Sequence, residues 1–172
     1  TDVKISKYRE VKVKGKVVFQ LVFNLTPFYP EGGGQVGDVG FIQNQNEKII
    51  IKDTRKENGE IIHFTEKAPS DLNSIFSAKV NVENRNLSAK NHSATHLLHH
   101  ALRTVLGEHV EQKGSLVNAD YLRFDFSHFS KVSKEEMEEI EKMVNADIRN
   151  SISLVENRNV PIEEAKKSGA MM

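Results

Sequence analysis

Asn91-His-Ser-Ala-Thr-His-Leu-Leu98 is the stretch that decides how the second half of this 172-residue chain is interpreted. His92 and His96 are four residues apart, so in a helix their imidazoles rise from the same face about one turn apart. Two imidazole nitrogens placed in this way can bind one divalent metal ion. The spacing therefore indicates a pair of metal ligands. A solvated polar face that carries histidines is the alternative.

The residues around this pair follow a helical period. One side of the expected helix is apolar, and His92, His96, His99 and Arg103 fall on the opposite side. We expect the apolar side to be buried in a core and the two imidazoles to face a cleft. The apolar side consists of Ala94, Leu97, Leu98, Ala101, Leu102 and Val105.

The expected helix runs from about residue 88 to residue 106. Ser88 is its N-cap and Gly107 its stop. His99 and His100 are interpreted as surface groups or as groups outside the first layer of a site. A Glu directly after the first histidine would indicate a zincin protease, but Ser93 stands there.

Residues 8 to about 82 contain short runs of β-branched and aromatic residues separated by turn signals. Asn58-Gly59 favours a hairpin turn, because both residues tolerate positive φ angles. Many short antiparallel strands at this spacing indicate a small barrel. The expected strands are 17–23, 41–42, 47–51, 60–64 and 78–82.

The rest of the chain combines strands and helices. Two strands are expected at 112–117 and 121–126, a short one at 154–156, and a last helix at 161–167. A further helix begins at Ser133, which can form a capping box with Glu136, and directs Met137, Ile140, Val144 and Ile148 inward. The sequence therefore predicts an α+β protein, with a small β-barrel domain over 1–84 and a second, α+β domain over 85–172.

Composition excludes some classes of function. Basic and acidic side chains balance at 24 each, so no overall positive charge marks the chain as a nucleic-acid binder. The basic run at 4–16 and the acidic run at 135–141 are interpreted as solvated surface. The absence of cysteine fits a reducing compartment, and no apolar run is long enough to span a membrane. The chain begins with Thr1, so we expect it to be part of a longer protein.

Two further motifs carry candidate chemistry. Thr26-Pro-Phe-Tyr-Pro-Glu-Gly-Gly-Gly-Gln-Val-Gly-Asp38 contains three consecutive glycines, which let the backbone bend sharply and approach a ligand or another domain closely. It lacks the Lys-Ser/Thr of a phosphate loop, and a plain turn between strands is the alternative. Gln112-Lys-Gly-Ser-Leu116 places an amide and a hydroxyl at the start of a strand.

Taken in order, these motifs closely resemble the editing region of alanyl-tRNA synthetase. Related editing modules occur in threonyl-tRNA synthetase and in free-standing alanyl-tRNA hydrolases. The resemblance spans nearly the whole chain, and it implies that residues 85–172 form a two-layer α/β editing domain, incomplete at its C-terminus. The matching segments are Thr26-Pro-Phe-Tyr29, Gly33-Gly-Gln-Val-Gly-Asp38, Asn91-His-Ser-Ala-Thr-His-Leu-Leu98, Gln112-Lys-Gly-Ser-Leu-Val117, Leu122-Arg-Phe-Asp-Phe126 and Ala165-Lys-Lys-Ser-Gly-Ala-Met171.

The resemblance implies hydrolysis of tRNA(Ala) that has been wrongly charged with serine or glycine, in support of the parent's ATP-dependent ligation of alanine to tRNA. A pocket shaped for alanine cannot strongly reject glycine or serine, so a second site must discriminate. Gln112 and Thr95 match catalytic positions that line the amino-acid pocket. Gly32 stands where many members carry Ser. The substrate-binding positions are Gly33, Gly34, Gln35 and Ser115.

The resemblance also implies a Zn²⁺ ion bound by His92, His96, a cysteine and a third histidine. The last two belong to a Cys-x-x-x-His element expected downstream of Met172. With two of four ligands present, we expect an empty or weakly occupied site and little or no deacylation by this fragment. The implied partners are the tRNA(Ala) acceptor end and the rest of the synthetase chain, in the cytoplasm.

Two alternatives stay open at this point. The first alternative is a free-standing alanyl-tRNA editing hydrolase. The second is a non-catalytic tRNA-binding module. The second alternative would show a steep dependence of RNA affinity on salt, because phosphate contacts release counterions.

Overall fold

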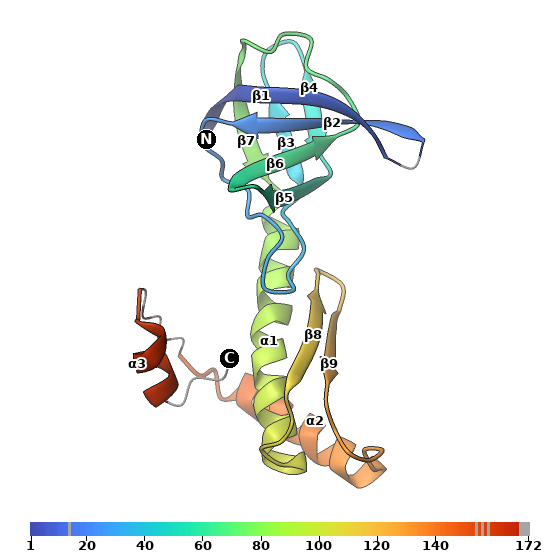
Figure 1. The fold of residues 1–172 in the computed structure, drawn as a ribbon, viewed down its shortest axis with the longest axis vertical. Coiled ribbons are helices and arrows are strands. Elements are labelled where there is room, and N and C mark those ends of the chain that lie inside the picture. The colour runs from blue at the N-terminus through green and yellow to red at the C-terminus, as the bar shows by residue number, and fades with distance from the viewer. Residues whose placement is uncertain (14, 154, 156, 158, 169–172) are drawn as a thin grey trace.

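A seven-stranded antiparallel sheet forms the first half of the computed structural model, which describes residues 1–13, 15–153, 155, 157 and 159–168. The strand order is β4-β3-β7-β1-β2-β6-β5, and the sheet occupies the upper end of the elongated molecule (Figure 1). The strands are β1 (Asp2–Val13), β2 (Lys16–Phe23), β3 (Gly40–Gln43), β4 (Lys48–Ile51), β5 (Asp53–Glu57), β6 (Glu60–Thr65) and β7 (Ile75–Val80).

The sheet is strongly curved because β1 belongs to both of its halves. β1 pairs with β7 through Asp2–Lys4 and with β2 from Ile5 onward, with an irregularity between Ile5 and Lys7. The two edge strands, β4 and β5, follow each other in the chain, and Lys52 between them donates its backbone N–H to the carbonyl of Phe64 at 2.8 Å. No ladder joins β4 to β5 within the described residues. The α+β class is confirmed, whereas the closed barrel that the sequence suggested is not found.

One hydrophobic cluster fills the concave side of this sheet. Leu21, Ile42, Ile51 and Phe76 have no exposed surface. The alternation of buried and exposed residues along β4 is the period of two that half-buried strands require. The cluster consists of Val3, Leu21, Phe23, Phe28, Ile42, Ile49, Ile51, Phe76 and Ala78.

The expected strands at 17–23, 41–42, 47–51 and 60–64 are confirmed with small shifts of their ends. The hairpin turn between β5 and β6 is also confirmed, and Asn58 and Gly59 have φ angles of 50° and 83°. The strand expected at 78–82 lies at 75–80 instead.

The helix α1 (Val82–Leu106) connects the two halves and is longer than expected. Its N-cap is Asn81, whose side chain accepts a hydrogen bond from the N–H of Asn84. The prediction of Ser88 as N-cap is therefore wrong, and Ser88 lies buried inside the helix. The domain boundary expected after residue 84 falls in the first turn of α1, so no linker separates the halves there.

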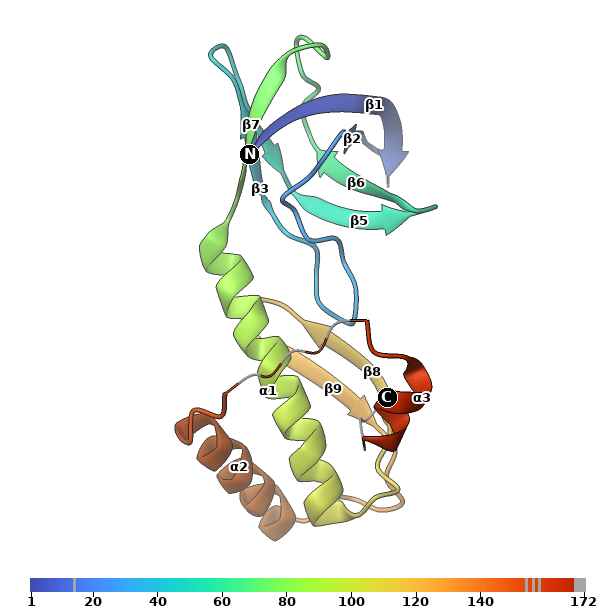
Figure 2. The ribbon, with the colours of Figure 1, turned by 90° about the vertical axis from the view of Figure 1, so that its left-hand side faces the viewer.

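The second half packs around the lower part of α1. Figure 2 shows α1 between α2 (Lys134–Arg149) and the two-stranded antiparallel sheet of β8 (Gln112–Val117) and β9 (Leu122–Phe126). Its hydrophobic cluster contains four buried residues, Ala101, Leu102, Val110 and Ile140.

The capping box at the start of α2 is confirmed, with Ser133 and Glu136 exchanging both hydrogen bonds. Of the residues expected to point inward, Ile140 is buried and Val144 packs on the cluster. Met137 and Ile148 are 55% and 53% exposed, so the prediction is wrong for them. The last helix, α3 (Ile162–Lys167), is confirmed. The strand expected at 154–156 falls largely outside the described residues.

Candidate functional site

A long loop between β2 and β3, residues 24–39, extends from the sheet toward the second half (Figures 1 and 2). At its tip, the N–H groups of Gly32 and Gln35 each donate to the carbonyl of the other residue at 3.0 Å. Gly33 and Gly34 have φ angles of 58° and 79°, a region that glycine adopts without strain. The glycine motif is therefore a tight turn, and this turn presents its backbone to the rest of the molecule.

The tip is joined to β8 by backbone hydrogen bonds. Val117 donates to the carbonyl of Gly34 at 2.8 Å, and Val36 donates to the carbonyl of Val117 at 3.0 Å. A Cβ atom on Gly34 would lie 2.0 Å from Oγ and 2.9 Å from the backbone carbonyl oxygen of Ser115, so the loop or the strand would have to shift. On the same strand, Nε2 of Gln112 donates to Oγ of Ser115 at 3.2 Å. Gly34, Ser115 and Gln112 thus form a continuous group.

The same tip contacts α1 through a histidine. Oε1 of Gln35 and Nδ1 of His92 are 2.9 Å apart. Since an amide oxygen only accepts, Nδ1 must carry the proton and Nε2 keeps its lone pair. A Cβ on Gly33 would lie 3.6 Å from Cε1 of His92 and 4.0 Å from its Nε2. The ring of His92 is therefore held by Gln35 and lies directly beside the glycine turn.

His92 and His96 lie side by side on α1. Their ring centroids are 5.3 Å apart, and the ring planes differ by 11°. His92 is half-buried and His96 is exposed. Burial lowers the pKa of His92, and the charge of neighbouring His96 lowers it further, so the neutral ring is favoured. Within the described parts of the chain, no three or more His, Cys, Asp or Glu side chains group together as a metal shell.

Thr95 and His99 are buried, whereas His92 is half-buried. Thr95 is 4% exposed, and its hydroxyl donates to the carbonyl of Asn91 at 2.9 Å. His99 was expected either at the surface or outside the first layer of a site, and the structure contradicts the surface position. Its ring is 8% exposed and lies 5.2 Å from the ring of Phe124 on β9, which covers that part of the helix. His100 is exposed, as expected.

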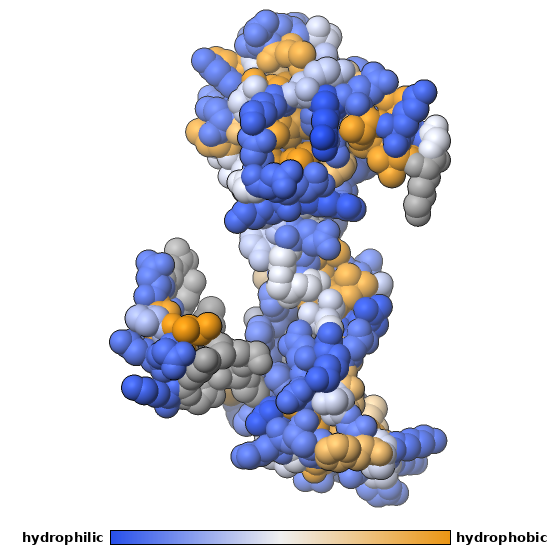
Figure 3. Space-filling view, viewed as in Figure 1, coloured by the Kyte–Doolittle hydropathy of each residue, from blue (hydrophilic) through white to orange (hydrophobic). Residues whose placement is uncertain are grey.

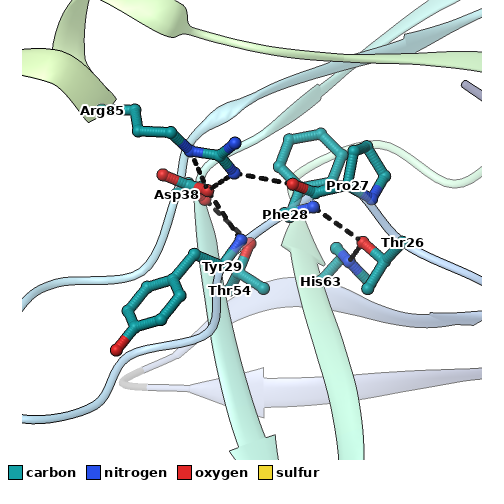
Figure 4. A network of polar contacts seen from close by, with 8 residues as sticks. All are labelled: Thr26, Pro27, Phe28, Tyr29, Asp38, Thr54, His63 and Arg85. Atoms are coloured by element: carbon teal, nitrogen blue, oxygen red, sulfur yellow. Dashed lines mark hydrogen bonds and ion pairs between the residues drawn. The ribbon is translucent and has the colours of Figure 1, made fainter. Parts of the chain in front are cut away.

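Sequence reasoning missed the network that holds the base of the loop (Figure 4). The buried carboxylate of Asp38 accepts hydrogen bonds from the N–H of Tyr29 at 2.6 Å and from Nε and Nη2 of Arg85, with 2.9 Å to Nε. Arg85 also donates to the carbonyl of Pro27 at 2.6 Å. Because Arg85 lies in the first turn of α1, this network ties the loop to the helix that carries His92.

A second missed residue is His63, which lies in β6 and has no exposed surface. Its Nδ1 lies 3.0 Å from the carbonyl of Leu21, and its Nε2 lies 2.7 Å from the hydroxyl of Thr26, at the start of the loop. The ring also stacks on Phe23 with centroids 4.1 Å apart. Burial lowers the pKa of His63 to about 4. The available signal was a histidine inside an otherwise apolar strand, Glu60-Ile-Ile-His-Phe64.

Comparison with known proteins identifies the family. Residues 2–85 match the family model described as tRNA synthetases class II (A). The chain is 60% identical over 168 residues to the alanine–tRNA ligase of Cytophaga hutchinsonii, covering 98% of this chain and 19% of that protein. The chain belongs to the alanyl-tRNA synthetase family.

Other members of this family match over the same extent. The alanine–tRNA ligase of Christiangramia forsetii is 55% identical over 172 residues, and that of Bacteroides fragilis is 54% identical over 170 residues. Each match covers 99% of this chain and 20% of the relative, so the chain spans about a fifth of the length of these alanyl-tRNA synthetases. None of the helices in the described residues has the length and apolar character needed to cross a membrane.

Proposed function

We propose that this part of an alanyl-tRNA synthetase hydrolyses tRNA(Ala) that carries serine or glycine. One observation supports the proposal above all: the turn at Gly33–Gln35 contacts His92 of α1 and Ser115 of β8 at the same time. Three segments far apart in the sequence thereby bring two imidazoles, an amide and a hydroxyl to one place. A structural turn between two strands would not need these contacts.

The two imidazoles fit a zinc ion. Gln35 fixes the tautomer of His92 so that Nε2 presents a lone pair, which is the arrangement that partners of metal-bound histidines provide. His96 lies parallel to this ring on the open side of the helix. His92 and His96 would hold the ion, and the parent chain would supply the remaining ligands. Bound zinc would supply positive charge that polarises an ester carbonyl or acidifies a water molecule.

The residues of this chain would position the charged end of the tRNA. The turn at Gly33 and Gly34 has no side chains, so the terminal ribose can approach the backbone closely beside His92. Gln112 and Ser115 can both donate and accept hydrogen bonds, so they would recognise a serine hydroxyl, which alanine lacks. Thr95 would limit the depth of the pocket, with its hydroxyl donating inward to Asn91.

The wider setting belongs to the same proposal. The partners are the acceptor end of tRNA(Ala) and the rest of the synthetase, whose ATP-dependent ligation of alanine this site corrects, in the cytoplasm. With two zinc ligands, the isolated 172-residue chain would bind zinc weakly and deacylate little. A free-standing hydrolase would instead be fully active at this length.

Deacylation by the full-length parent tests the proposal. Ser-tRNA(Ala) and Ala-tRNA(Ala) are incubated with the wild type and with Gln112→Ala, with and without a chelator. We expect Gln112→Ala to change the ratio of the two rates and the chelator to abolish Ser-tRNA(Ala) hydrolysis. Gln45→Ala, which removes an exposed amide between β3 and β4, is the matched control. Unaltered discrimination would remove Gln112 from the pocket, and no hydrolysis by the wild type would leave tRNA binding as the only role.

A further inference from the structure

A second pair of histidines lies where α1 ends and α2 begins, at the opposite end of α1 from the sheet. His109 belongs to the segment 107–111 between α1 and β8, and His128 belongs to the segment 127–133 between β9 and α2. Nε2 of His109 and Nδ1 of His128 are 2.9 Å apart. The ring centroids are 5.1 Å apart with planes inclined by 21°, close to the values of 5.3 Å and 11° for His92 and His96.

The backbone holds these two rings in place. Ser127 donates its N–H to the carbonyl of Glu111 at 3.0 Å, and Oγ of Ser127 accepts from the N–H of Glu111 at 3.2 Å. Gly107 has a φ angle of 114°, and a Cβ there would lie 3.0 Å from Nδ1 of His109. The fold therefore holds the two nitrogens opposite each other, and the rings do not need to rearrange before they bind an ion.

The surroundings suit a cation. Two nitrogens that bind one tetrahedral Zn²⁺ at about 2.0–2.1 Å lie roughly 3.3 Å apart, so the 2.9 Å separation of these two nitrogens needs to widen only slightly. Nε2 of His128 has a partner in Oγ of Ser130 at 3.3 Å, which fixes the outer nitrogen of that ring. The exposed ring of Phe129 stacks on His109 at 4.5 Å and covers one side.

We propose that Nε2 of His109 and Nδ1 of His128 form a bidentate site for a divalent transition-metal ion that prefers imidazole, such as Zn²⁺, with water completing the shell. The ion takes the place of the proton between the two nitrogens, and this proton moves to the other nitrogen of its own ring. Both rings stay neutral, and each presents one lone pair to the ion. The bound ion ties the end of α1 to the start of α2 and is independent of the site at His92.

Zinc titration of a chain without the first pair tests this site. The background variant carries His92→Ala and His96→Ala, and Zn²⁺ alone is the probe, followed by calorimetry and by NMR of the histidine ring nitrogens. Because this site also has two protein ligands, we expect weak binding that saturates at one Zn²⁺ per chain, with shifts confined to His109 and His128. Adding His109→Ala or His128→Ala should weaken Zn²⁺ binding at least about tenfold. Loss of a residue that only supports a metal ligand already costs about that much, and loss of a ligand should cost no less.

His100→Ala on the same background is the matched control, because it removes an exposed histidine of α1. We expect the affinity of this control to be unchanged. The proposal is overturned if the background variant binds no Zn²⁺, or if His100→Ala weakens binding as much as His109→Ala. If the background variant does not fold, as its amide spectrum would reveal, the ring signals of His109 and His128 in the wild-type chain decide. These signals must shift with Zn²⁺, and their constancy would also overturn the proposal.

Discussion

The two halves of the molecule differ in how completely their apolar side chains are covered. The cluster under the curved sheet contains nine buried residues and two partly buried neighbours. Among the residues that the structure describes, the cluster around α1 contains four buried residues and eight partly buried ones. Apolar patches lie on the surface of both halves (Figure 3), so the difference concerns the interior. The glycine loop is thus built on the well-packed half, whereas both imidazoles stand on the half that is packed less completely.

The loop at 24–39 is held at both its base and its tip. The base of the loop is fixed by buried polar contacts of Asp38 and His63. Its tip then holds His92 and β8 through hydrogen bonds. We infer that the sheet half acts as the rigid reference against which the histidine helix and the Gln112 strand are placed.

Truncation of a core side chain should give the largest losses of stability, and the loss should be larger in the sheet half. Phe76→Ala removes a ring with no exposed surface, and we expect a loss of about 4 kcal/mol in the free energy of unfolding. Ile140→Ala should cost about 2 kcal/mol, because its surroundings are partly open and relax more easily. The chain has no tryptophan, so urea unfolding is followed by circular dichroism and amide hydrogen exchange. An equal loss for both variants, with exchange of the sheet amides in both, would contradict the difference between the halves.

Acid should weaken the sheet half through His63. The pKa of His63 is about 4 in the folded chain and near 6.5 in the unfolded chain. The unfolded state therefore binds a proton first, and stability falls as the pH is lowered from 6.5 to 4, by roughly 3 kcal/mol in total. Above pH 7 this effect is absent. His63→Gln should lower stability at neutral pH but remove this pH dependence, as measured by urea unfolding at a series of pH values. Parallel pH profiles for the two proteins would assign the acid sensitivity elsewhere.

Replacement of either of two arginines should lower the stability by a smaller amount, which differs between the two positions. Arg85→Ala leaves the carboxylate of Asp38, which is 5% exposed, without its cation, and should cost about 2 kcal/mol. Arg123→Ala breaks an ion pair with Asp125 whose side chains are 61% and 46% exposed, and should cost less than about 1 kcal/mol. Thermal unfolding of both variants measures the two losses. The reverse order would mean that Arg85 does not anchor the loop.

Much of the fold was predictable from local patterns. The capping box at Ser133, the Asn58-Gly59 turn and the apolar strands were visible because each depends on a few neighbouring residues. β1 was missed because Lys4, Lys7 and Arg9 read as a solvated run. They lie on a strand whose buried residue is Val3. The start of α1 was misplaced because Val82 continues the apolar pattern of β7, whereas Asn81 caps the helix.

The residues of the candidate site could be named from the sequence, whereas the contacts that hold them in place could not. The resemblance named His92, His96, Gly33, Gly34, Gln35, Gln112 and Ser115, and the fold brings these residues close together. The roles of Asp38, Arg85 and His63 depend on contacts between distant segments, which no local period reveals. The burial of His99 was missed for the same reason. Its ring lies on the side of α1 that the helical period placed outside, but Phe124 on β9, 25 positions later in the chain, covers it.

The most direct test compares two glycines in the full-length parent. Gly34→Ala drives a Cβ into Ser115, whereas Gly59→Ala adds a Cβ in open space at a similar positive φ of 83°. Both variants place a side chain at a similar positive φ, 79° at Gly34 and 83° at Gly59, so their difference reports on the contact between loop and strand. We expect Gly34→Ala to slow hydrolysis of Ser-tRNA(Ala) about a hundredfold, the cost of displacing a reacting group by roughly 1 Å, and Gly59→Ala to leave it near the wild-type rate. Equal rates for the two variants would contradict a site built where the glycine turn meets α1 and β8.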